Sequence, residues 1–209
     1  MVVPRRTLQI AIPTRMNNQK GFLKTAFTSA LLIYPLNLDA IPDSYVAPII
    51  YLFLISLINT TLFMGKLAGS ALLKDNIQHA LIAFSYSLVM TFIAECLLCF
   101  LFSFFSSKII SQEHTSKQFG LNASSFTYIP VALLLTLIEP QILGWIGSFG
   151  AVLLMSYYLQ ATYSTYFPYT SQRIQVIHQI YIFLIYYLVV FASLIIPGKV
   201  FEHILKQDQ

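Results

Sequence analysis

One carboxyl side chain, Glu95, lies near the middle of a long apolar stretch at residues 79–106. A carboxylate at that depth in a bilayer costs at least about 2.5 kcal/mol, so a glutamate there is expected to face protein or water. Glu95 then either binds a cation or relays a proton, or it is protonated and hydrogen-bonds a neighbouring helix. Asn59, in an earlier apolar stretch, is the polar residue that could share such a site. Because no Arg, Lys or His lies at comparable depth, the structural role is favoured, and replacing Glu95 with glutamine is expected to preserve assembly.

Two cysteines, Cys96 and Cys99, have the spacing of a metal-binding pair, but the sequence around them supplies no further ligands. The residues between them are apolar, and the four histidines lie at the ends of apolar stretches or between them. We therefore expect packing residues here and no metal site. Phosphate-binding, dinucleotide-binding, serine-hydrolase and metalloprotease motifs are also missing from the sequence. We expect neither a cofactor nor catalytic activity.

The composition is typical of a membrane protein. Of the 209 residues, 57% are hydrophobic and 10% are charged, whereas soluble domains average about 25% charged residues. Unbroken apolar runs of roughly 15 to 25 residues fit membrane-spanning helices, because the strands of transmembrane barrels show shorter, alternating segments. No soluble domain carries a basic patch, so nucleic acid is not an expected partner. The expected partners are the lipid bilayer and either other integral membrane subunits or further copies of the chain.

The order of these segments predicts an all-α, polytopic membrane helical bundle with about five transmembrane helices and an N-terminal interfacial helix. Residues 22–38 form the interfacial segment, because polar residues and a proline interrupt its apolar character. Pro197-Gly198 is expected to end the last helix. The chain divides into a basic tail with the interfacial helix (1–43), a five-helix domain (44–197) and a short polar or amphipathic tail (198–209). The five predicted transmembrane helices are residues 44–64, 79–106, 124–138, 142–163 and 176–196.

The distribution of positive charge predicts the orientation in the membrane. With five spans, eight of the twelve basic residues lie on the same side as the N-terminus. The positive-inside rule therefore favours a cytosolic N-terminus. If residues 22–38 span the membrane instead, every later segment inverts. The sequence fits a bacterial inner membrane and a eukaryotic endomembrane or organelle membrane equally.

Two apolar stretches, 124–138 and 142–163, follow each other with almost no linker and predict a tight helical hairpin. The first is short for crossing a bilayer alone, so it is expected to lean on the second. Small side chains three or four residues apart let two helix backbones approach closely. The second helix is therefore expected to pack on the first, or on a partner subunit, through a small-residue face. That face consists of Gly144, Gly147, Gly150 and Ala151.

Short patterns around this hairpin resemble the Yip1 family of five-span membrane proteins. The patterns are Phe126-Thr-Tyr128-Ile-Pro130, Ile138-Glu-Pro140-Gln-Ile-Leu-Gly144-Trp and Tyr157-Tyr158-Leu. The sequence departs from the family at Asp43-Ser-Tyr45-Val-Ala-Pro48, which only loosely matches the Asp-Leu-Tyr-Gly-Pro element of eukaryotic members. The resemblance implies a non-enzymatic scaffold or trafficking-type protein, and eukaryotic relatives engage small GTPases and each other. It also implies structural roles for Tyr128, Pro130 and Pro140.

Three functions are compatible with these observations. The small-residue face and the missing catalytic motifs favour a non-enzymatic scaffold or partner-binding subunit, of trafficking or membrane-organisation type. A membrane subunit of a transporter, or of an ion or proton pathway, would use Glu95 and the polar group Asn59-Thr60-Thr61, although the two halves of the chain show no repeat. An accessory subunit of a large respiratory or translocation complex would dock through the basic N-terminal tail.

Overall fold

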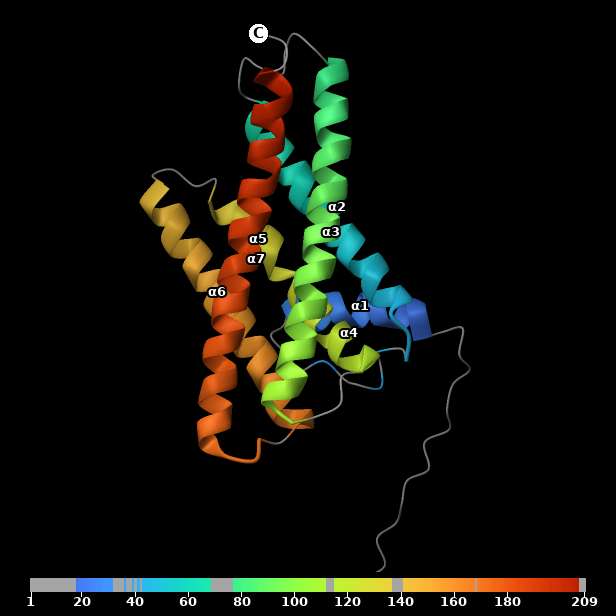
Figure 1. Ribbon diagram of the computed structural model, residues 1–209, viewed down its shortest axis with the longest axis vertical. Helices are drawn as coiled ribbons and strands as arrows, with labels where there is room; N and C mark the ends of the chain where they lie inside the picture. Colours follow the sequence, from blue (N-terminus) through green and yellow to red (C-terminus); the bar gives the residue numbers. More distant parts are fainter. Residues whose placement is uncertain are drawn as a thin grey trace, which may run out of the picture.

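The chain folds into a set of helices, seen in a computed structural model that describes residues 18–31, 36, 39, 41, 43–68, 77–111, 115–136, 141–167 and 169–206. Within these ranges the regular structure is helical, without strands. In chain order the helices are α1 (Asn18–Leu31), α2 (Val46–Ala68), α3 (Ile77–Ile109), α4 (Ser116–Ser125), α5 (Tyr128–Leu135), α6 (Gln141–Tyr166) and α7 (Gln172–Lys206) (Figure 1).

Four of these helices, α2, α3, α6 and α7, are long and apolar enough to cross a membrane. The prediction of an all-α fold is confirmed, and four of the five predicted spans correspond to helices that are long and apolar enough to cross a membrane. The stretch predicted as the third span, residues 124–138, does not form one long helix. Its described residues belong to the end of α4 and to α5, which are separated by Phe126 and Thr127.

Local chemistry explains the break between α4 and α5. Pro130 has no N–H to donate to the carbonyl of Phe126, and its ring is tolerated because it lies in the first turn of α5. The Thr127 hydroxyl donates to the carbonyl oxygen of Ser124 at 2.5 Å, and such a bond competes with main-chain helix bonds. Tyr128 and Pro130 therefore lie at the start of a new helix. Pro140, the third residue implied by the Yip1 resemblance, lies outside the described residues.

Helix α4 is a polar helix held inside the bundle. Its start is fixed by a capping box, in which Thr115 accepts a hydrogen bond from the N–H of Gln118 and the Gln118 side chain accepts one from the N–H of Thr115, each at 3.3 Å. From Gln118 to Ser125 every residue is buried. A buried Ser- and Asn-containing helix requires hydrogen-bond partners from the helices around it.

Helix α7 does not end at Pro197-Gly198 as predicted. It continues to Lys206 with Pro197 inside the helix. A β-carbon placed on Gly198 would lie 3.5 Å from Cζ of Phe63, so α7 and α2 are in close contact there and their packing supports the interrupted helix. Because Pro197 lacks an N–H, the carbonyl of Ser193 receives no main-chain hydrogen bond from it.

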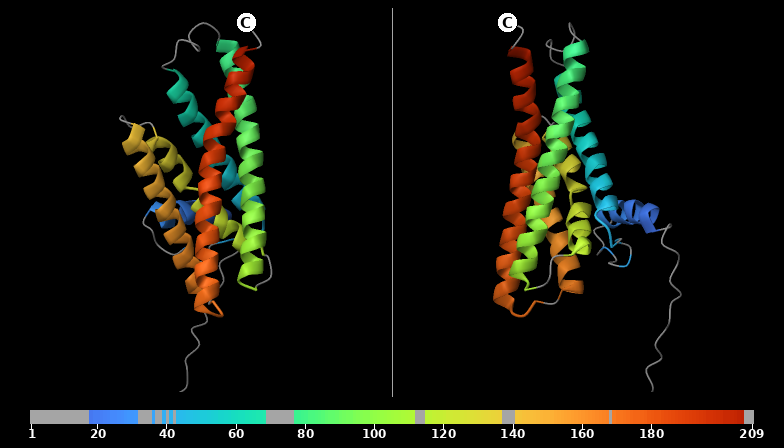
Figure 2. Two further views of the ribbon diagram at one scale, coloured as in Figure 1. Left: turned by 60° about the vertical axis from the view of Figure 1, so that its left-hand side comes forward. Right: turned by 45° about the vertical axis from the view of Figure 1, so that its right-hand side comes forward.

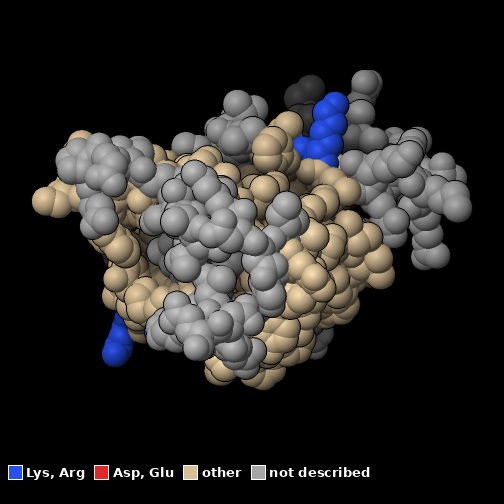
Figure 3. Space-filling model, turned by 90° about the horizontal axis from the view of Figure 1, so that it is seen from above, with Lys and Arg blue, Asp and Glu red and all other residues tan. Residues whose placement is uncertain are grey.

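The long helices α3 and α7 run side by side, with α2 crossing α3 on one side and α6 flanking α7 on the other (Figures 1 and 2). The short helices α4 and α5 lie between them, and α1 runs crosswise to the long helices. Seen from above, most of the described surface carries neither acidic nor basic side chains (Figure 3). The largest fully buried side chains include the aromatic residues Phe22, Phe102, Phe126, Tyr158, Tyr163 and Tyr186.

Candidate functional site

The carboxyl group of Glu95 lies where α2, α3 and α7 meet, and the side chain is 1% exposed. The Ser56 hydroxyl oxygen is 2.6 Å from Oε2 of Glu95. Two groups contact Oε1: the Asn59 amide nitrogen at 2.7 Å and the Ser193 hydroxyl at 3.4 Å. The two polar residues that the sequence singled out, Glu95 and Asn59, are thus in direct contact. We refer to Glu95, Ser56, Asn59 and Ser193 as the Glu95 site.

Several buried oxygen atoms near this site make no hydrogen bond to any described residue. They are Oδ1 of Asn59 and the hydroxyl oxygens of Thr60, Ser87 and Thr91. Buried polar atoms normally have partners, so such a group of unpartnered atoms is unusual. Thr91 and Ser87 precede Glu95 by one and two helical turns on α3, and Thr60 neighbours Asn59 on α2. The carboxyl therefore sits at one end of a set of unpartnered hydroxyl groups.

The hydroxyls of Ser87 and Thr91 belong to a polar repeat along α3. Every fourth residue of the buried side is polar or a thiol, in the order Ser87, Thr91, Glu95, Cys99, Ser103 and Ser107. Four residues turn a helix by about 400°, so the repeat drifts by about 40° at each step and winds around α3. It faces α2 at Glu95 and α4 at Ser103. This repeat is visible in the sequence, and sequence reasoning that considered Glu95 alone missed it.

A second polar region surrounds α4. Asn122 donates to the Ser103 hydroxyl at 2.7 Å and accepts from the Tyr163 hydroxyl at 3.2 Å. His178 bonds to Ser106 at 3.0 Å and to Tyr169 at 2.8 Å. Three further hydroxyl pairs tie the α4–α5 break to the surrounding helices: Tyr51 with Thr127, Tyr158 with Ser124, and Tyr186 with Ser125. We refer to these groups together as the α4 network.

The two cysteines have different surroundings on α3. Cys99 is buried and its thiol lies 3.7 Å from the carbonyl of Phe119, whereas Cys96 is only partly buried, and both are free thiols. Among the described residues, no three of His, Cys, Asp and Glu come together as metal ligands. The cysteines contribute a weak hydrogen bond and packing.

The predicted small-residue face of α6 divides into two parts. A β-carbon placed on Gly147 would lie 3.3 Å from the Leu135 side chain of α5, whereas one on Gly150 would meet nothing within 4 Å. The Ser148 hydroxyl, which sequence reasoning did not single out, lies 2.9 Å from the carbonyl oxygen of Ala132 on α5 and 2.9 Å from that of Gly144, and it can donate to either. Ala151 is buried. Helix α6 therefore contacts α5 around residues 147 and 148, and Gly150 lies on a more open side.

Comparisons with known proteins give no assignment, since no protein-family model, curated protein or solved structure matches the chain. Membership of the Yip1 family therefore stays a prediction, and the function has to be inferred from the contacts within the chain.

Proposed function

We propose that this chain is a five-pass integral membrane protein in which α4 and α5 together form the third pass. The stretch from Ser116 to Leu135 is about 30 Å long at 1.5 Å per residue, which matches the hydrocarbon thickness of a bilayer. In Figure 1, α5 continues upward from α4 toward the end at which α6 begins, which supports one broken pass. Irregular backbone at membrane depth is tolerated where protein surrounds it, as it does at Phe126.

In this arrangement α1 lies along the membrane surface and the N-terminus is cytosolic. Support comes from its crosswise direction in Figure 2 and from its one-sided burial. Phe22 and Ala26 are fully buried, with the Phe22 ring 5.9 Å from that of Tyr51, whereas Lys24 on the same helix is exposed. The basic residues near the N-terminus support the orientation through the positive-inside rule.

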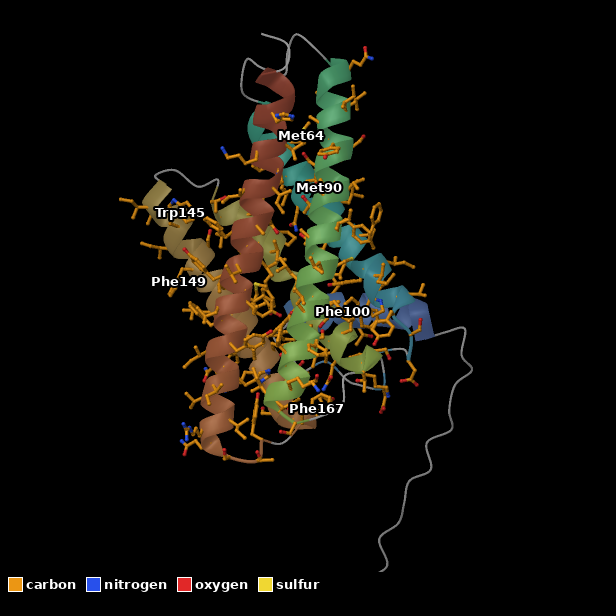
Figure 4. All side chains as sticks on the ribbon, in the orientation of Figure 1. Met64, Met90, Phe100, Trp145, Phe149 and Phe167 are labelled. Carbon is orange, nitrogen blue, oxygen red and sulfur yellow. The ribbon has the colours of Figure 1, made fainter. Side chains whose placement is uncertain are left out.

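The function that we propose is non-enzymatic binding of another membrane-embedded helix on the outer side of α6, as in a scaffold or complex subunit. The observation that carries this proposal is a groove of about 180 Å³ between α6 and α7. Its lining is aromatic and apolar except for Ser148, and it consists of Trp145, Ser148, Phe149, Val152, Tyr187, Val190 and Phe191. Figure 4 shows Trp145 and Phe149 on the upper part of α6.

Photo-crosslinking in native membranes tests the proposal. A crosslinking amino acid at Trp145 is expected to capture a protein, and Tyr187→Ala, which removes a ring that lines the α7 wall of the groove, is expected to weaken that capture. The control position is Leu97 on α3, which is equally exposed at 57% against 58% but lies away from the groove. Capture at both positions alike, or purification in mild detergent as a monomer with no partner chain, would contradict the proposal.

A second function, binding of a proton or a cation at Glu95, is favoured by a separate observation. The buried carboxyl lies beside hydroxyl and amide oxygens that have no partner among the described residues. Partner binding at α6 and ligand binding at Glu95 involve different parts of the bundle, so each can be tested without the other.

A further inference from the structure

We propose that Glu95 is a proton-binding site: its carboxyl is neutral in this arrangement, with the proton on Oε2. The inference develops the second function above and is independent of partner binding at α6. On release, the O–H bond at Oε2 breaks, the carboxylate keeps the electron pair, and the proton leaves to water. The ligand is the proton itself, and a monovalent cation is the competing occupant.

The contacts of the Ser56 hydroxyl favour a proton on the carboxyl, because only then can both of them be full hydrogen bonds. The Ser56 oxygen lies 2.6 Å from Oε2 of Glu95 and 2.9 Å from the carbonyl oxygen of Leu52. A serine hydroxyl has one hydrogen, so it can donate to only one of these two acceptors. If Oε2 carries a proton and donates it to Ser56, the Ser56 hydroxyl donates to Leu52 and both contacts are hydrogen bonds.

The other carboxyl oxygen, Oε1, has the surroundings of a carbonyl oxygen. The Asn59 amide nitrogen, which can only donate, lies 2.7 Å from it, and the Ser193 hydroxyl lies 3.4 Å from it. The two oxygens of Glu95 are therefore distinguished: Oε1 accepts and Oε2 donates. A neutral carboxyl group has this pattern of one donor and one principal acceptor.

No charged group of the surrounding helices offers a counter-charge to a carboxylate at this position. Helix α2 has no Asp, Glu, His, Lys or Arg from Val46 to Gly65, and α7 has none between His178 and Lys199. The titratable groups nearest in sequence are Cys96 and Cys99 on α3 itself, together with tyrosines of α2 and α7. A buried carboxylate without a cation carries a large desolvation cost, and a bound proton removes it.

Infrared spectroscopy of the full chain in lipid bilayers tests the protonation state. At neutral pH we expect a carbonyl-stretching band of a neutral carboxylic acid that is absent from Glu95→Gln. The glutamine variant is expected to fold, because its amide reproduces one donor and one acceptor. Should it fail to fold, ¹³C-labelled glutamate in the unmodified chain shifts the same band. A spectrum without a neutral-acid band, or one whose carboxylate band responds to sodium, overturns the proposal.

Discussion

The Glu95 site and the α4 network are both polar, buried and in contact with α3, yet they differ in how completely their groups are paired. In the α4 network, hydroxyl, amide and imidazole groups meet partners from neighbouring helices, and the unpartnered atom on α4 itself is the amide nitrogen of Gln118. Around Glu95, four oxygen atoms have no partner in the described part of the chain. A fully paired network fixes one arrangement of helices, whereas partly paired groups retain the capacity to bind something else.

The difference also separates structural from functional polarity within one helical bundle. The helix break at Phe126 and Thr127 leaves buried polar groups that need partners from the protein, and the α4 network supplies them. No such need explains a carboxyl in the middle of α3 beside the unpartnered hydroxyls of Thr91 and Ser87.

The largest expected effect comes from breaking the α4 network at its centre. Asn122→Leu removes the bonds to both Ser103 and Tyr163. The Ser103 hydroxyl keeps its bond to the carbonyl oxygen of Cys99, whereas the buried Tyr163 hydroxyl loses the Asn122 oxygen as its acceptor. We expect the free energy of unfolding to fall by about 3 kcal/mol, because each unsatisfied buried group costs about 1–3 kcal/mol. Unfolding in mixed micelles measures this loss. A smaller loss of unfolding free energy in Asn122→Leu than in a Glu95 variant would show that the α4 network does not stabilise the bundle more than the Glu95 site does.

At the Glu95 site, the effect depends on which residue replaces the carboxyl. Glu95→Ala leaves the Asn59 amide without its acceptor and is expected to cost about 2 kcal/mol. Glu95→Gln keeps a donor and an acceptor. Its free energy of unfolding is expected to lie within about 0.5 kcal/mol of that of the unmodified chain. The same unfolding assay compares them. Equal losses in both variants would contradict a neutral carboxyl.

Helix α6 offers a smaller test of which small residues pack inside the chain. Gly147→Ala places a methyl group 3.3 Å from Leu135 and is expected to cost about 1 kcal/mol or less after the side chain shifts. Gly150→Ala meets no neighbour and is expected to leave stability unchanged or slightly raised, because alanine favours a helix. Greater destabilisation by Gly150→Ala than by Gly147→Ala would contradict the assignment of the α6–α5 contact to Gly147.

The smallest effect is expected at the edge of the α4 network, where Tyr169 lies between α6 and α7. Burial raises the pKa of this tyrosine to about 12, above the ordinary value of about 10. The folded-state pKa is higher than the unfolded-state pKa. The contribution of Tyr169 to the free energy of unfolding is therefore fully present below about pH 10 and is lost as the pH rises through about 12. Tyr169→Phe removes the bond to His178 and is expected to abolish this alkaline component of the unfolding curve. An unchanged curve would remove Tyr169 from the network.

Much of the architecture could be predicted from the sequence because it depends on local composition. The long apolar runs identify α2, α3, α6 and α7, and Glu95 and Asn59 stand out as polar residues within them. The break within the predicted third span was missed because its cause, Pro130 combined with hydroxyl-to-carbonyl bonds, competes with a strongly apolar run. The continuation of α7 through Pro197 depends on packing against α2, which a single segment does not reveal.

The partners of Glu95 could be predicted only in part. Ser56 and Ser193 come from helices 39 and 98 residues away in the sequence, and nothing local distinguishes them from other serines. The four-residue polar repeat of α3 was available in the sequence and would have indicated a polar side of the helix. Which of its hydroxyls are paired depends on α4, whose position inside the bundle is a tertiary property.

The protonation of Glu95 can be measured most directly by solid-state NMR of the carboxyl carbon in lipid bilayers. The chain contains four glutamates, and replacing Glu113, Glu139 and Glu202 with glutamine leaves Glu95 as the only site labelled by ¹³C-glutamate. The account predicts the chemical shift of a neutral carboxylic acid at neutral pH. A carboxylate shift at neutral pH would contradict the account, and a shift that depends on sodium would assign the site to a cation instead.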